Sequence, residues 1–158
     1  MWGMTLKEQL REDLTAAIKT RDGLRSATIR LTLSAITNAE VAGEQARELS
    51  EDEVLQVITH EAKKRREAAD AFAKAGREDS AARERAEGEV LAGYLPQPLS
   101  DDELAVIVAE AVQEAAAGGA EGPRAMGAVM KIVSPKVLGR AEGRRVAALV
   151  KQALSRSE

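Results

Sequence analysis

One helix-start signal occurs three times in the chain and constrains the fold more than any other feature. It is a hydroxyl residue followed three positions later by glutamate, directly before an amphipathic run: Thr5 and Glu8, Ser50 and Glu53, and Ser100 and Glu103. In such a capping box the hydroxyl accepts a hydrogen bond from an unpaired helix amide, and the glutamate reaches back to the cap residue. No stretch alternates apolar and polar residues as a half-buried strand does. The sequence therefore predicts an all-α fold.

Two prolines, Pro96 and Pro98, indicate a boundary within the chain. Because they cannot continue a helix and hold the backbone extended, Tyr94–Ser100 is predicted to be a stiff connector. We expect an N-terminal helical domain of about four helices at residues 1–95 and a small C-terminal three-helix bundle at residues 96–158. The predicted helices span about 5–20, 24–42, 51–75 and 80–93 before the connector, and about 101–117, 122–135 and 142–155 after it.

Apolar residues predict which parts of the helices are buried. On the first helix Leu6, Leu10, Leu14 and Ile18 lie on one stripe; the second is richer in apolar residues, Ile29, Leu31, Leu33 and Ile36, and is predicted to be the most buried helix. The second helix also carries a polar strip of Arg30, Ser34 and Asn38, spaced four residues apart. We interpret this strip as a hydrogen-bonded contact to a neighbouring helix, because buried polar groups are usually satisfied within the protein. No functional role is assigned to it.

Oppositely charged residues four positions apart predict ion pairs on the third and fourth helices: Glu61 with Arg65, Lys63 with Glu67, Arg83 with Glu87, and Arg85 with Glu89. The charged block around residues 61–67 is thus predicted to neutralise itself on a solvated face, with an RNA contact as the alternative.

The composition excludes several classes of function. The chain has no cysteine and a single histidine, His60, so thiolate chemistry, histidine-based zinc sites and Ser-His-Asp catalysis lack their residues. We therefore expect no metal and no cofactor. The first residues, with Trp2 in a loose leader, lack a cationic stretch followed by an apolar core, and no run is long enough to span a membrane. The expected location is cytoplasmic.

The C-terminal end of the chain is basic. From Arg124 onward there are eight cations and two anions, a net charge of +6 in a chain whose total is −3. Clustered Lys and Arg bind phosphates and release counterions, so this end is predicted to face a polyanion. Within it, Pro135 is expected to end one helix, and Gly139 and Gly143 to bracket a turn that opens the last helix.

Several cations of this segment are candidates for phosphate binding. Arg144 and Lys151 are seven positions apart on the last helix, and Arg140 extends the same line at the helix start, where unpaired amides favour an anion. The alternative is a basic surface without function, in which Gly127 and Gly143 only allow helices to approach closely.

Motifs along nearly the whole chain resemble the GatB/YqeY family, which is related to the tail of the B subunit of tRNA-dependent amidotransferases. They are Arg30-Leu-x-Leu-Ser34, Arg65-Arg66-Glu67, Gly76-Arg77-x-Asp79, Tyr94-Leu95-Pro96, Met126-Gly127-x-x-Met130-Lys131, Pro135-Lys136-Val137 and Gly139-Arg140-Ala141-x-Gly143. Glu142 stands where the family pattern has Asp. The resemblance implies tRNA contact by the basic residues Lys131, Lys136, Arg140, Arg144 and Arg145, to which the helical line adds Lys151. It also implies amidotransferase or aminoacyl-tRNA synthetase components as partners.

Three functions follow from this resemblance and these residues. The first is a tRNA-binding module; since the basic segment has no aromatic residue on which unpaired bases could stack, a folded RNA fits better than a single strand, and no DNA partner is expected. The second is a glutamine-dependent carbon-nitrogen ligase. The chain argues against it, because it has no phosphate-binding Gly-Lys loop, no Ser/Lys amidase signature and no catalytic cysteine. The third is a protein-interaction adaptor without a nucleic-acid role.

Overall fold

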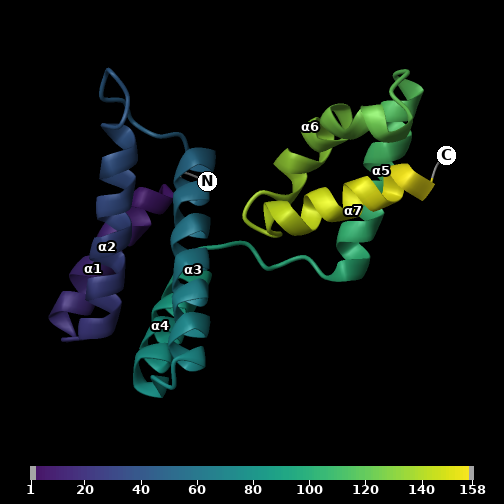
Figure 1. Cartoon of the computed structure of the whole chain (residues 1–158). Coiled ribbons are helices and arrows are strands. Elements are labelled where there is room, and N and C mark those ends of the chain that lie inside the picture. Colours follow the sequence, from purple (N-terminus) through teal and green to yellow (C-terminus); the bar gives the residue numbers. More distant parts are fainter. Residues whose placement is uncertain (1–2, 157–158) are drawn as a thin grey trace. The chain divides into compact units, whose positions relative to one another are not determined.

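The computed structural model describes residues 3–156, and every regular element within this range is a helix (Figure 1). The predicted all-α fold is confirmed. Trp2, expected in a leader, lies outside the described residues. Residues up to Pro96 form one compact unit and residues from Gln97 form a second; we call them the N-terminal and the C-terminal unit.

The N-terminal unit contains four helices: α1 (Leu6–Lys19), α2 (Gly23–Glu40), α3 (Glu51–Lys74) and α4 (Glu78–Ala92). The C-terminal unit contains three helices and a short 3-10 turn: α5 (Asp101–Ala117), η1 (Gly122–Ala125), α6 (Met126–Val137) and α7 (Gly143–Arg156). Helices α3 and α4 run side by side and share the largest helix contact of the N-terminal unit, whereas α5 packs against both α6 and α7 (Figure 1).

All three predicted capping boxes are formed. The hydroxyls of Thr5, Ser50 and Ser100 accept hydrogen bonds from the amides three positions later, at 3.1, 3.2 and 3.1 Å. The glutamates at those positions accept in return from the amides of the cap residues. Each cap contributes about 1 kcal/mol to helix stability.

Two apolar residues expected in the core are exposed. Ile18 and Leu31 have relative exposures of 49% and 47%, whereas Leu10 and Ile29 are fully buried. Residues four apart advance by about 40° around a helix, so a stripe starting at Leu6 has turned by about 120° at Ile18. Leu31 is exposed for a different reason: it lies two positions after Ile29, about 200° around the helix, and therefore on nearly the opposite face. The prediction was wrong for these two residues because it did not take their angles around the helix into account.

The polar strip of α2 faces solvent. Arg30, Ser34 and Asn38 are all exposed, so the interpretation as a contact to a neighbouring helix was wrong. The polar groups that α2 does bury are Ser26, Thr28 and Thr32. They need no neighbouring helix, because each hydroxyl donates to a backbone carbonyl of its own helix or its start.

The charges of α3 pair differently from the prediction. Arg65 reaches across to α4, where its Nη1 lies 3.4 Å from Oε2 of Glu84 and 3.5 Å from Oε2 of Glu87. Glu61 is buried and pairs with Lys64 at 3.1 Å, so the predicted Glu61–Arg65 pair was wrong. The close packing of α3 on α4 brings the carboxylates of α4 within reach of this long side chain. Of the other predicted pairs, Lys63–Glu67 and Arg83–Glu87 are confirmed at 3.9 and 3.3 Å. The predicted Arg85–Glu89 pair was wrong, because these two side chains form no ion pair among the described residues.

The two carboxylates around Arg65 are expected to respond differently to neutralisation. Burial raises the pKa of Glu84 above its ordinary value of 4.5, and the nearby Glu87 adds to this while Arg65 opposes it. A raised folded-state pKa gives stability that is fully present below pH 4.5 and is lost as the pH rises through the folded-state value. The free energy of unfolding of Glu84→Gln, relative to that of the unaltered protein, should therefore be higher at pH 7 than at pH 4. Urea unfolding at the two pH values measures it.

Glu87→Gln is the matched control. Glu87 pairs with both Arg65 and Arg83, so at pH 7 this variant is expected to be less stable by up to about 1 kcal/mol. If the two variants show the same stability at both pH values, burial of the Glu84 charge has no energetic consequence.

The connector is fixed to both units. The hydroxyl of Tyr94 donates to the carboxylate of Asp13 on α1, and Tyr94 and Leu95 pack against the core of the N-terminal unit. Leu99, only 5% exposed, belongs to the core of the C-terminal unit. Three residues, 96–98, separate these anchors.

The C-terminal unit is built around apolar residues of all three helices. Leu104, Val108, Ala111 and Ala115 of α5 are buried, together with Val129, Val133, Val146, Val150 and Leu154 from the other two helices. The expectation that Pro135 ends a helix was wrong, because α6 continues to Val137. Proline lacks the N–H group that would donate to the carbonyl four residues earlier, but the residues after it keep theirs, so the helix can continue beyond it.

None of the helices among residues 3–156 is long and apolar enough to cross a membrane.

Candidate nucleic-acid interface

The C-terminal unit is polarised in charge rather than basic overall. From residue 97 onward the chain has eight acidic and eight basic side chains. Six of the acidic ones lie in α5 and the segment that follows it, whereas all eight basic ones come later, from Arg124 on. An anionic ligand would therefore meet attraction at η1, α6 and α7 and repulsion at α5.

Two of the predicted cations point at the connector instead of into solvent. The Nε of Arg140 donates to the carbonyl oxygen of Gln97 at 2.9 Å. The Nη1 of Arg145 donates to the carbonyl oxygen of Leu99 at 3.2 Å, and its Nη2 forms an ion pair with the carboxylate of Asp101. Both side chains are only partly exposed.

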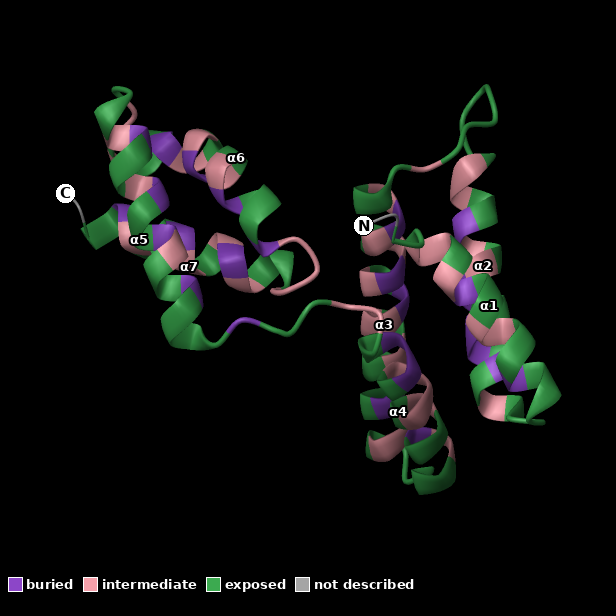
Figure 2. Cartoon of the chain, turned by 180° about the vertical axis from the view of Figure 1, so that it is seen from behind, coloured by how far each residue is buried: buried purple, intermediate pink, exposed green. Residues whose placement is uncertain are grey.

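Two other predicted cations share the outer face of α7. Arg144 and Lys151 are exposed, and their positions differ by about 20° around the helix axis. Val146 and Val150, on the opposite side, are buried in the core. Figure 2 shows buried and exposed positions following one another along α7. Burial of that apolar stripe forces Arg144 and Lys151 outward, so they form a pair of cations about 10 Å apart along the helix.

Helix α6 presents its two lysines in different directions. Lys131 and Lys136 are both exposed, but five positions on a helix separate them by about 140°. Lys131 lies on the side away from buried Val129 and Val133. Lys136 lies in the last turn, next to the corner that leads to α7.

The glycines of this segment serve different purposes. Gly139 has a φ of +75°, a left-handed conformation that side chains disfavour, so the corner between α6 and α7 requires glycine there. A Cβ atom at Gly127 or Gly143 would meet no heavy atom within 4 Å. Close approach of helices, one interpretation of these two glycines, is therefore not the reason for them.

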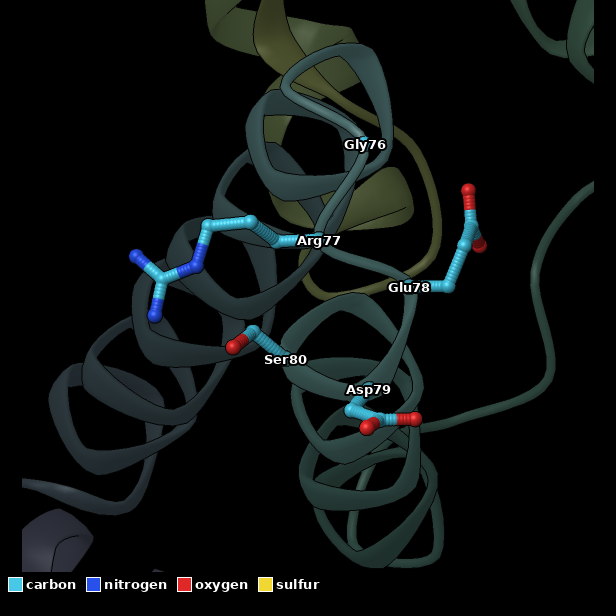
Figure 3. A pocket seen from close by; sticks show the side chains of 5 residues that line it. All are labelled: Gly76, Arg77, Glu78, Asp79 and Ser80. Atoms are coloured by element: carbon cyan, nitrogen blue, oxygen red, sulfur yellow. The ribbon is translucent and has the colours of Figure 1, made fainter.

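A surface hollow in the N-terminal unit lies between α3 and α4 and involves none of the predicted site residues. One continuous segment lines it, Gly76–Ser80, and its side chains spread away from one another (Figure 3). The guanidinium of Arg77 lies 5.0 Å from the centroid of the Phe72 ring, a cation-π contact that holds this turn.

Among residues 3–156 no three His, Asp or Glu side chains are grouped as a metal site.

A family model described as Yqey-like protein matches residues 7–154. The chain belongs to the YqeY-like protein family. The resemblance noted from its motifs is thereby confirmed. No curated protein matches the chain.

In this YqeY-like chain, the sequence located the exposed cations but not the internal partners of Arg140 and Arg145. These partners, residues 97–101, are more than 40 positions away in the chain. One signal was available: an acidic first turn on α5 beside a basic corner within one small unit favours ion pairing between them. Four predicted cations, Lys131, Lys136, Arg144 and Lys151, have no ion pair among the described residues.

Proposed function

We propose that this YqeY-like chain binds tRNA through the basic side of its C-terminal unit. The single observation that supports this most is the outward pair of Arg144 and Lys151 on α7, which packing of the opposite stripe holds away from the core. Lys131 and Lys136 add exposed positive charge from α6. The implied relation to the tail of the amidotransferase B subunit supports tRNA as the polyanion.

The recognition mode follows from what these side chains offer. Lysine and arginine contact phosphates, and the segment has no aromatic residue for base stacking. A double-helical RNA read by shape and backbone suits such a surface. With about four phosphate contacts, the affinity should be modest. It should fall as the salt concentration rises, in proportion to about the third to fourth power of that concentration.

Removal of the α7 pair is the direct test. The double variant Arg144→Ala/Lys151→Ala is expected to lower affinity for tRNA transcripts about tenfold at low salt, because two phosphate contacts are lost. The salt dependence should become shallower by about two contacts. Gel shift or fluorescence anisotropy over a salt series measures both quantities.

The matched control removes two exposed lysines from the N-terminal unit, Lys19→Ala/Lys74→Ala. It changes the net charge equally, so a comparable loss of affinity would show general attraction rather than a site on α7. Unchanged binding by the α7 double variant would contradict the proposal.

A protein-interaction adaptor is the second candidate function. It is favoured by exposed apolar side chains on and directly after α2: Leu31 is 47% exposed beside the polar strip, and Val41, the residue that follows the helix, is 57% exposed. Under this alternative the α7 double variant behaves like the unaltered chain toward tRNA.

A further inference from the structure

The connector and the first turn of α5, residues 97–103, hold two of the three arginines around the start of α7, Arg140 and Arg145. Arg140 donates to the Gln97 carbonyl, and its own carbonyl accepts from the Leu99 amide at 2.9 Å. Arg145 donates to the Leu99 carbonyl and pairs with the Asp101 carboxylate. The backbone thus runs along this corner of the bundle with one guanidinium on the carbonyl of Gln97 and another on that of Leu99, two residues further on.

The groups that these guanidinium ions hold resemble a phosphate in chemistry. A guanidinium prefers a planar pair of oxygen acceptors, at least one of them charged, and carboxylate and phosphate both satisfy it. Arg145 has such a pair in the Leu99 carbonyl and Asp101. Arg140 has the Gln97 carbonyl and stands near Glu103, whose pKa is lowered first by hydrogen bonds from Ser100 and then by the Arg140 charge.

The contact is open to exchange. The side chain of Asp101 is 91% exposed and that of Arg145 is 35% exposed, so water and ions reach the pair. Such exposed pairs contribute little to stability, and a polyanion can replace the carboxylate at small cost.

We propose that residues 97–103 act as a built-in competitor of the RNA backbone for Arg140 and Arg145. In the free protein the two arginines hold the connector; in the complex a phosphate takes the place of Asp101, and the connector loosens. This inference rests on the proposed tRNA binding and adds its regulation: occupancy of the basic corner is coupled to the freedom of the segment that joins the two units.

Neutralisation of two adjacent aspartates tests the competition. Asp101→Asn and Asp102→Asn each remove one negative charge from the exposed first turn of α5. Weaker general repulsion of the RNA should therefore raise the affinity of both variants equally. Only Asp101 pairs with Arg145. Asp101→Asn is therefore expected to bind tRNA transcripts about two- to fivefold more tightly than Asp102→Asn, the range that the loss of one exposed ion pair allows.

Hydrogen exchange of the Leu99 amide gives a second readout. This amide is bonded to the Arg140 carbonyl, so it should exchange faster in the unaltered protein saturated with tRNA than in the free protein. In Asp101→Asn it should exchange faster even without RNA, and in Asp102→Asn it should not.

Two results would overturn the inference in distinguishable ways. Equal affinities of the two variants, with normal tRNA binding by the unaltered chain, would overturn the competition and leave the proposed function intact. Failure of the unaltered chain to bind tRNA at low salt would overturn both. Far-UV circular dichroism of the variants checks that neither result comes from misfolding.

Discussion

Leu104→Ala is expected to destabilise the C-terminal unit by about 3 kcal/mol, the largest effect of any single change considered for this chain. Leu104 is fully buried where α5 meets the other helices of the unit. Truncation loses its apolar contacts and leaves a cavity. A unit of this size has little stability to lose, since small cores bury a small share of their surface.

Hydrogen exchange measured by mass spectrometry follows this change in each unit separately. Protection of α5, α6 and α7 should drop, while α1 to α4 should exchange as before, because they belong to the other compact unit. Val106→Ala on the same helix is the control, since Val106 is 57% exposed and its truncation should cost less than about 0.5 kcal/mol. A parallel loss of protection in α1 to α4 would mean that the chain unfolds as one cooperative whole.

Arg65→Ala is expected to lower the stability of the N-terminal unit by about 2 kcal/mol. Loss of one partner of a fully buried ion pair costs about 3–5 kcal/mol and of an exposed pair about 0–1 kcal/mol. Arg65, Glu84 and Glu87 lie between these limits, with side-chain exposures of 18%, 17% and 12%. The variant leaves two half-buried carboxylates without this counter-charge. Urea unfolding at pH 7 measures the loss, and Arg85→Ala, which removes an exposed cation of α4, is the control.

A double variant separates charge from packing in this effect. Arg65→Ala combined with Glu84→Gln should recover part of the lost stability, because a neutral amide tolerates the missing guanidinium better than a carboxylate does. If the two changes are additive, Arg65 stabilises the unit through the packing of its aliphatic chain and not through its charge.

Local signals in the sequence were sufficient for the helices. A capping box needs only residues three positions apart, so the starts at Thr5, Ser50 and Ser100 could be predicted and are confirmed. Ile18 and Leu31 show the limit of this approach. Whether an apolar residue is buried depends on its angle around the helix and on which helices face it, and only the assembled unit determines the second.

The candidate site depends more strongly on contacts between distant residues. Arg144 and Lys151 could be assigned to an outer face because the buried stripe of their own helix defines it. Arg145 is their neighbour in sequence, yet it is bound to Leu99 and Asp101. Periodicity within one helix carries no information about a carboxylate on another helix, so sequence grouped together cations that the structure separates.

The short link between Tyr94 and Leu99 has a consequence for any ligand large enough to touch both units. With Leu95 packed against one core and Leu99 buried in the other, the four Cα steps between them span at most about 14 Å. A molecule captured by one unit is then presented to the other at a high effective concentration, because the tether confines both to a small shared volume. Two contacts that are each too weak to persist alone can thereby combine into durable, bivalent attachment.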